Sequence, residues 1–524
     1  MGSPHLEAPL LVEPSACVPG AAPGAPRARW RAGLLLIYCA SLQLLIYIDR
    51  GIIAGLLNFA QVEFGIDHFH SGLLGTIFLA GFMLMSPIAA AVAGQGGAGA
   101  LRAIGVGLAV WTLSIWACGT ASTYAVLLLG RAMAGCGEAA LVSLAPPLID
   151  DAAPPGKKSA YLAVFFSSIF LGLGVGFVIA GQASSWADGR VLFLAEGVVM
   201  APLCAVALFC GSNLAPDKES SEGATTEGKR PSCEEPGSFH EAADTHGEPK
   251  SSTLAGPVSA LDVLRAPVYT LLVLGYCATI FTMGGLAFWA PSYLQKVLGA
   301  RGAAGDSVLG AITGLTGICG TTLGGVLLDA LDGRLGRRRL QAVRLCAVFA
   351  ALSCPVTAAA VAARSRPLFF ASLALGQLLV FASTAPANIA MMEAVGPAQR
   401  GLALGLCTLA SHALGDLVPP VLVGYIADAT GSLIPGMWLL ALWLLWSALF
   451  WSAALVRTAG EEEEAEVRRR APARRTLPDS DWSTDSGKSD ETKGPEYLPR
   501  SDTRERAEKG KERREGHPSK AAIW

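Results

Sequence analysis

Apolar segments about 20 residues long recur along this chain, and they constrain its fold more than any other feature. Of its 524 residues, 52% are hydrophobic and only 16% are charged, whereas about 25% of the residues of a soluble globular domain are charged. A helix needs roughly 20 apolar residues to cross the hydrocarbon layer of a membrane. We therefore expect an all-α membrane protein.

Twelve such segments are predicted as transmembrane helices, and they fall into two sets of six. Those of the first set are residues 33–51, 72–93, 101–119, 124–148, 160–182 and 191–211. Those of the second set are residues 267–294, 308–328, 341–362, 367–392, 402–427 and 434–456. The chain is thus expected to contain two six-helix halves, residues 33–211 and 267–456.

Polar segments flank and separate the two halves. Residues 212–266 are rich in Glu, Lys, Ser, Gly and Pro, and residues 457–524 include a run of glutamates near their start. Segments of this composition bury too little apolar surface to fold alone. We expect a largely disordered linker at 212–266 and disordered tails at 1–32 and 457–524.

Basic residues are distributed unevenly among the predicted loops. If both termini face the cytosol, that side carries 17 Lys and Arg residues outside the C-terminal tail, and the opposite side carries five. Cytosolic loops hold the excess of basic residues in membrane proteins, so the termini and the linker are expected in the cytosol. The N-terminal residues lack the pattern of a cleavable secretory signal, and the first span is expected to direct its own insertion.

Two ionisable residues, Arg131 and Glu138, interrupt the fourth apolar segment. They are seven residues apart and therefore share one face of a helix. A charge near the centre of a bilayer costs roughly 3 kcal/mol even on lenient scales, so it normally faces a polar cavity and a partner. A neighbouring guanidinium decides whether a buried carboxylate holds or releases a proton, which suits a proton-coupled transporter. A structural salt bridge between helices is the alternative.

Asp49 and Arg50 stand together at the end of the first predicted span. Adjacent residues of a helix point about 100° apart, so these two are not expected to pair with each other. We expect Asp49 to face the same cavity as Arg131 and Glu138, with Arg131 held between the two carboxylates. In the alternative, Asp49 and Arg50 lie at the membrane interface and reach water.

His412 and Asp416 are four residues apart and lie on one face of the eleventh predicted span. An acid beside an imidazole could form a proton relay or a polar contact to a substrate, and a hydrogen bond that only packs helices is the alternative. Two further acids within spans, Glu196 and Glu393, stand alone, and a direct functional role is not favoured for either.

Acidic and basic residues surround a glycine-containing turn between the eighth and ninth spans. Asp329 precedes this turn, and Arg334, Arg337 and Arg338 follow it closely. Such residues can lock two helices at the cytosolic face through ion pairs, so they are predicted to form a cytosolic gate. The alternative is that the basic residues only orient the chain in the membrane.

Nothing in the sequence indicates an enzyme. No pairing of nucleophile and base and no metal-ligand spacing stands out, and the glycine-rich runs lack the strand that a dinucleotide fingerprint requires. Small residues in the spans instead allow close packing of membrane helices. We expect no cofactor, no metal ion and no nucleic-acid partner.

The arrangement of two six-helix halves, the loop at 325–339 and the charged fourth span together resemble the major facilitator superfamily. Within it, several blocks are similar to the spinster family, and together they cover most of residues 33–456. They include Tyr47-Ile-Asp-Arg50, Gly130-Arg131, Gly137-Glu138-Ala139, Leu286-Ala-Phe-Trp-Ala-Pro291 and Ser411-His-Ala-Leu-Gly-Asp416. The chain departs from the family at Phe170, where similar proteins have proline, so a smaller bend is expected in the fifth span.

The resemblance implies a secondary active transporter that moves an amphiphilic lipid, of the lysophospholipid or sphingosine phosphate type, by alternating access with proton coupling. It implies that Asp49, Arg131, Glu138, His412 and Asp416 bind substrate or protons. A plasma or endolysosomal membrane is the expected location, and the protein is expected to work as a monomer in contact with membrane lipids. A transporter of a small organic solute or anion is one alternative. A membrane receptor or scaffold that signals through its C-terminal tail is another.

Overall fold

Helices make up the part of the chain that the structure describes, and twelve stretches of it are long and apolar enough to cross a membrane. This confirms the predicted number of spans. The computed structural model describes residues 25–92, 96–154, 157–214, 259–300, 303–396 and 399–470. Most of the predicted linker, and residues 1–24 and 471–524 of the predicted tails, lie outside these ranges.

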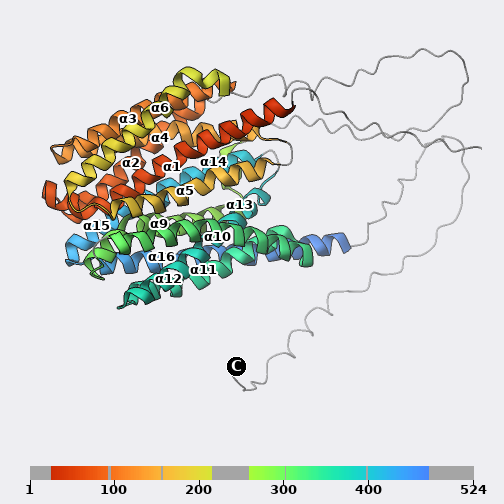
Figure 1. The fold of residues 1–524 in the computed structure, drawn as a ribbon. Coiled ribbons are helices and arrows are strands. Elements are labelled where there is room, and N and C mark those ends of the chain that lie inside the picture. Colours follow the sequence, from red (N-terminus) through yellow and green to blue (C-terminus); the bar gives the residue numbers. More distant parts are fainter. Residues whose placement is uncertain are drawn as a thin grey trace, which may run out of the picture. The chain divides into compact units, whose positions relative to one another are not determined.

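The helices of the first half are α1 (Ala25–Phe64), α2 (His68–Val92), α3 (Gly96–Gly119), α4 (Tyr124–Ala152), α5 (Lys158–Ala180) and α6 (Trp186–Leu214). A short helix, α8 (Ala260–Leu264), precedes the second half. That half comprises α9 (Pro267–Lys296), α10 (Ala303–Leu335), α11 (Arg338–Ala362), α12 (Arg366–Ala382), α13 (Thr384–Glu393), α14 (Arg400–Ala410), a π-helix (Ser411–Asp416), α15 (Pro419–Thr430) and α16 (Ile434–Arg470). Figure 1 shows these helices lying side by side.

Helix packing defines each half of the protein and the contact between the halves. In the first half α1 packs on α5 and α2 packs on α4, and in the second half α10 and α11 both pack on α12. The halves meet where α5 packs on α10 and α2 packs on α15. At the first of these contacts, a Cβ atom on Gly174 or on Gly310 would overlap the carbonyl oxygen of the other. The two backbones therefore touch directly, as small residues allow in membrane helices.

The first span is longer than the sequence predicted. α1 has 40 residues and ends at Phe64, whereas the predicted span ended at residue 51. The additional turns are mostly apolar, and Ile52, Leu56 and Ala60 are buried against the rest of the protein. The helix therefore continues through the interior of the protein. Asp49 and Arg50 consequently lie well inside α1, which contradicts the alternative that placed them at the membrane interface.

Two predicted spans are interrupted in the structure. The tenth is divided at Ser383 between α12 and α13, and the eleventh changes to a π-helix at Ser411–Asp416. In the wider turn the Leu417 N–H donates to the carbonyl oxygen of His412, five residues back, at 3.1 Å. Two residues with no N–H to donate, Pro419 and Pro420, begin α15 two residues after Leu417. π-Turns of this kind occur frequently at functional sites.

Candidate functional site

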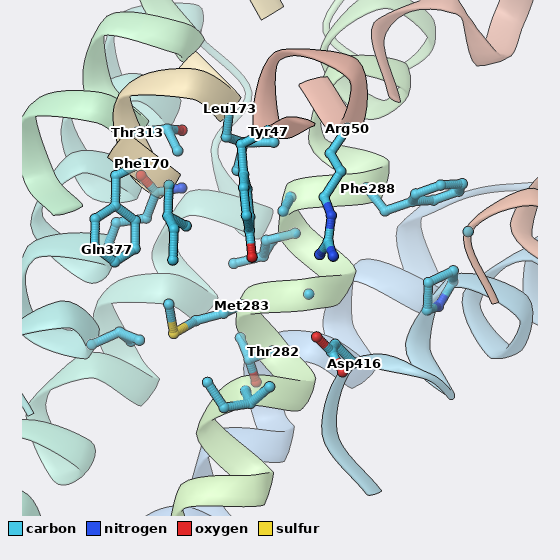
Figure 2. A pocket seen from close by; sticks show the side chains of 18 of the residues that line it. Tyr47, Arg50, Phe170, Leu173, Thr282, Met283, Phe288, Thr313, Gln377 and Asp416 are labelled. Carbon is cyan, nitrogen blue, oxygen red and sulfur yellow. The ribbon is translucent and has the colours of Figure 1, made fainter. Parts of the chain in front are cut away.

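A cavity of about 220 Å³ opens between the two halves. We call it the central cavity, and Figure 2 shows side chains from both halves pointing into it. Most of its lining is apolar, including Leu173, Met283 and Phe288. Its charged lining residues are Arg50 and Arg131 from the first half and Asp416 from the second. The space therefore combines an apolar wall with three charged groups.

Arg131 forms a fully buried ion pair with Asp49. Its Nη1 donates to both carboxylate oxygens at 2.8 Å, and the two side chains are 1% and 0% exposed. The expectation that Asp49 meets Arg131 is thus confirmed by the geometry. The expectation that Arg131 lies between two carboxylates is wrong, because Glu138 bonds elsewhere. Removing one partner of a buried pair leaves an uncompensated charge, so these two residues depend on each other.

Glu138 bonds Arg50, the neighbour of Asp49 in the sequence. Arg50 Nη2 donates to Glu138 Oε1 at 2.6 Å, and Arg50 is 18% exposed while Glu138 is wholly buried. The second carboxylate oxygen, Oε2, has no hydrogen-bond partner among the described residues. Arg50 thus lies between a buried acid and the central cavity. Arg50 is not among the site residues expected from the sequence. Two adjacent opposite charges on one span, facing two opposite charges on another, are the signal that could have indicated this crossed pairing.

An aromatic side chain on α2 holds both arginines in place. The Phe78 ring centroid is 4.8 Å from the guanidinium carbon of Arg50 and 4.8 Å from that of Arg131. The Tyr47 ring lies 4.6 Å from the same carbon of Arg50. Cations are attracted to the faces of aromatic rings at such distances. Phe78 could not be identified from the sequence, because a phenylalanine in an apolar span gives no signal of what it contacts.

Replacing Phe78 by Leu should lower the free energy of unfolding by about 1–2 kcal/mol, because two cation–π contacts are lost while an apolar side chain remains. The measurement is denaturant unfolding of the purified protein. Phe166→Leu on the exposed face of α5 is the matched control and should change stability little. Equal stability of the two variants would contradict the role assigned to Phe78.

The π-helix carries the predicted His412 and Asp416 pair, of which Asp416 lines the same cavity. His412 Nδ1 lies 3.1 Å from Asp416 Oδ1, and the side chains are 20% and 16% exposed. The His412 ring also packs edge-on against Phe82 of the first half, with ring centroids 5.0 Å apart. Figure 2 shows Asp416 and Arg50 directed into the cavity from opposite halves. The contact predicted for an α-helical turn is therefore made, but by a π-turn.

The five residues proposed from the sequence are thus brought into one region. Arg131 and Asp416 line the central cavity. Asp49 bonds Arg131, and His412 bonds Asp416. Glu138 reaches the cavity through Arg50, to which it is bonded.

Comparison with known proteins places this architecture among membrane transporters. A family model described as the Major Facilitator Superfamily matches residues 39–360. A probable sphingolipid transporter of Arabidopsis thaliana, spinster homolog 2, is 31% identical over 426 residues, which are 75% of this chain and 81% of the relative. This chain belongs to the spinster family of the major facilitator superfamily. Membership also confirms that it is a transporter and not an enzyme.

Other spinster-family proteins match the chain over most of its length. A sphingosine-1-phosphate transporter of Danio rerio is 28% identical over 403 residues, 73% of this chain and 73% of the relative. A bacterial homolog of the human lysosomal transporter spinster, solved in an inward-facing and unoccupied conformation, has the same fold. Its TM-score is 0.65 at 18% identity, over 82% of this chain and 98% of that one.

In this spinster-family chain, the predicted gate residues lie where α10 meets α11. Arg338 donates to Asp329 at 3.0 Å and to Asp332 at 3.3 Å, and its Nε lies 3.8 Å from Glu393 on α13. These contacts join α10, α11 and α13 within the second half. Arg334 is exposed in the last turn of α10 and makes no recorded ion pair with the described residues.

The remaining gate residue, Arg337, contacts an extension of α16. The sequence assigned residues 457–470 to the C-terminal tail, whereas α16 continues through them to Arg470. Arg337 donates to Glu466 at 2.6 Å, and Arg339 donates to Glu461 at 2.8 Å. The glutamates of the extra turns of α16 therefore pair with arginines at the start of α11. We call this region, where α10 and α11 meet, the gate end of the bundle.

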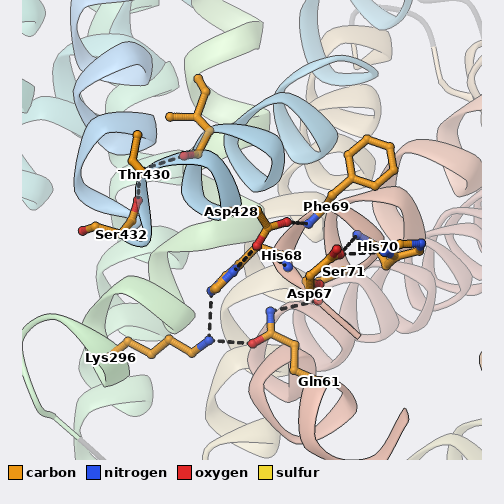
Figure 3. A network of polar contacts seen from close by, with 11 residues as sticks. Gln61, Asp67, His68, Phe69, His70, Ser71, Lys296, Asp428, Thr430 and Ser432 are labelled. Carbon is orange, nitrogen blue, oxygen red and sulfur yellow. Dashed lines mark hydrogen bonds and ion pairs between the residues drawn. The ribbon is translucent and has the colours of Figure 1, made fainter. Parts of the chain in front are cut away.

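Polar contacts join the two halves at the opposite end, which we call the latched end (Figure 3). Asp428 of α15 accepts hydrogen bonds from the backbone N–H groups of His68 and Phe69 at 3.0 and 2.7 Å. Lys296 of α9 lies 2.5 Å from Gln61 Oε1 and 3.1 Å from His68 Nε2. A carboxylate from one half therefore caps the first turn of α2 in the other half, where the helix dipole favours negative charge.

Replacing Asp428 by Asn should loosen the latched end, because it removes the charge that caps α2. Hydrogen bonds to charged groups contribute about 1.5–3 kcal/mol each, so we expect at least about tenfold faster hydrogen–deuterium exchange in the first turn of α2. Mass spectrometry of the purified variant measures this rate. Asp188→Asn is the matched control, since Asp188 accepts the N–H groups of Ser184 and Ser185 next to its own helix. Unchanged exchange in α2 of the Asp428 variant would contradict this assignment.

Proposed function

We propose that this chain transports an amphiphilic lipid with an anionic headgroup from one side of a membrane to the other by alternating access, coupled to protons. The observation that carries the proposal is the position of Arg50, between the buried Glu138 carboxylate and the central cavity. Relatives named as transporters of sphingolipids and of sphingosine-1-phosphate support the lipid class.

The lining of the central cavity fits the two parts of such a substrate. Apolar side chains from both halves, among them Leu173, Met283 and Phe381, would contact the acyl or sphingoid chain. Arg50 would bind the headgroup, because the planar guanidinium matches the geometry of phosphate and carboxylate oxygens. Arg131 lines the same cavity but already binds both oxygens of Asp49, so we assign it a positioning role.

Proton coupling would follow from competition for Arg50. When Glu138 is ionised, its Oε1 holds the guanidinium. A proton on this carboxylate removes its charge and frees Arg50 for an anionic headgroup, so the proton and the substrate would bind together. On the facing wall, the Asp416 carboxylate is held by His412.

Alternating access would use the two ends of the bundle. The contacts of Asp428 and Lys296 with α1 and α2 close the latched end between the halves. After these contacts break, the gate end would close against the first half, with α10, α11 and α13 held together by the gate residues Asp329 and Arg338. The excess of basic residues in the predicted loops on one side supports a cytosolic location for the gate end, the termini and the linker. A plasma or endolysosomal membrane remains the proposed location, with the monomer as the working unit.

Transport assays in proteoliposomes test this function. The purified chain would be reconstituted and offered labelled sphingosine phosphate, a labelled lysophospholipid and a labelled small organic anion, each at several pH gradients. We expect saturable flux of a lipid that increases as the pH falls on the loading side. Flux of the small anion alone, or no flux from folded protein at any gradient, would contradict the proposal.

A further inference from the structure

His68 connects a cation of one helix to a carboxylate of another at the latched end (Figure 3). Its Nδ1 lies 2.7 Å from Asp428 Oδ1 on α15, and its Nε2 lies 3.1 Å from the ammonium of Lys296, the last residue of α9. His68 itself is the first residue of α2. One imidazole of the first half therefore joins two helices of the second half.

These two contacts define the protonation state of the His68 ring. An ionised carboxylate only accepts hydrogen bonds, and an ammonium only donates them. Nδ1 must therefore carry a hydrogen that it donates to Asp428, and Nε2 must be without one so that it accepts from Lys296. The geometry thus fits the neutral imidazole in a single tautomer.

A second proton on the ring is incompatible with one of the two contacts. It would bind Nε2, and this N–H group would then face the Lys296 ammonium, so that two donors and two positive charges would meet at 3.1 Å. The contact with Asp428 would become an ion pair and persist. Histidine changes its charge between about pH 5 and 8. The His68 side chain is 25% exposed, so water can deliver the proton.

The other groups around His68 do not offset this repulsion. On α1, Gln61 faces the same ammonium and is uncharged. The Trp289 ring of α9 also carries no charge, and its centroid lies 6.1 Å from that of His68. The remaining titratable groups nearby contact one another: His70 with Asp67, the Tyr124 hydroxyl with the carbonyl oxygen of His70, and Glu63 with Arg190.

We propose that His68 is a pH-sensitive switch of the latched end. The neutral ring holds the end of α9 to α2, and the protonated ring releases Lys296 while Asp428 still caps α2. Only Gln61 then keeps its recorded contact with the ammonium, so the end of α9 becomes freer to move. The switch responds to the pH at the latched end and is separate from the wholly buried Glu138. Its location on the side opposite the cytosol rests on the orientation proposed above.

Hydrogen–deuterium exchange of the purified full chain, recorded without substrate at about pH 8 and about pH 5, tests this switch. Each rate is divided by that of the unfolded chain at the same pH. We expect residues 293–300, at the end of α9, to exchange about three- to tenfold faster at the lower pH, the factor expected for the loss of one hydrogen bond. The first turn of α2 should keep its protection, because Asp428 continues to cap it.

Three variants assign the response to this contact. His68→Gln keeps an acceptor for Lys296 but cannot gain a proton, so the difference between the two pH values should disappear. Lys296→Gln removes the charge that is repelled and should abolish the difference as well, and it serves if His68→Gln does not fold. His70→Gln is the matched control on the same helix, since the recorded ion pair of His70 is with Asp67, and it should keep the difference.

Equal protection of residues 293–300 at the two pH values in the unmodified chain overturns the inference, and this comparison needs no variant to fold. A difference that persists in folded His68→Gln or Lys296→Gln also overturns it, as does a difference that is lost in His70→Gln. The outcome is separable from that of the proposed function. Exchange is measured without substrate, so absence of lipid flux would leave the switch standing, and absence of the switch would leave the proposed transport standing.

Discussion

Replacing Arg131 by Gln is expected to lower the free energy of unfolding by about 3–5 kcal/mol, because the Asp49 carboxylate would remain buried without its cation. Both side chains are almost completely shielded from solvent, so water cannot compensate for the lost charge. Transport should be lost as well, since the neighbouring Arg50 is positioned by the same Phe78 ring. Denaturant unfolding of the purified variant gives the first quantity, and lipid flux gives the second.

Two further variants distinguish the cost of an unpaired buried charge from general destabilisation of the helix. In the double variant Asp49→Asn with Arg131→Gln no charge remains, and most of the lost stability should return. Arg190→Gln breaks an exposed pair with Glu63 and a hydrogen bond to the carbonyl oxygen of Ala121, and the exposed pair should contribute less than about 1 kcal/mol. If Arg131→Gln is no more damaging than Arg190→Gln, the buried pair does not have the importance assigned to it.

Glu138→Gln is expected to remove the pH dependence of transport while flux persists. Glutamine has the shape of the protonated acid, so Arg50 would be free for the headgroup at every pH. In the unmodified protein, one proton must bind before the substrate. Flux should therefore increase by up to about tenfold for each unit by which the pH falls on the loading side. Flux would be recorded in proteoliposomes over a series of pH values on that side.

A surface acid provides the control for this experiment. Glu63→Gln removes a carboxylate that is 44% exposed at the end of α1, and its flux should keep the pH dependence of the unmodified protein. A Glu138→Gln variant whose flux still increases as the pH falls would exclude Glu138 from proton coupling. The His412 and Asp416 pair would then be the next residues to test.

The number of spans could be predicted because apolar length is a property of each segment taken alone. The end of α1 could not. Charges and a glycine at 49–51 are typical of a span leaving the membrane, and only the packing of Ile52 and Leu56 against other helices shows that the helix continues. The π-turn at Ser411–Asp416 was missed as well, because apolar periodicity does not distinguish it from a turn of α-helix.

The sequence predicts which residues belong to the candidate site better than it predicts which of them pair with each other. Burying a charge in an apolar span is costly wherever it occurs, so Arg131 and Glu138 are evident from the sequence. Which acid meets which arginine depends on how α1 and α4 are rotated toward each other, and this rotation is set by packing across the whole interface. The crossed pairing, with Arg50 on Glu138, therefore required the structure.

The direct backbone contact between Gly174 and Gly310 has a mechanical consequence. On α5 it lies six residues from the end of the helix at Ala180 and sixteen from the other end at Lys158, which are lever arms of about 9 and 24 Å. If α5 rocks on α10 as a rigid rod about this fulcrum, a displacement of about 2 Å at the short arm becomes about 5 Å at the long arm. The Lys158 end of α5 would therefore move more than twice as far as the Ala180 end in each transport cycle. The opening at the Lys158 end would then be the wider of the two.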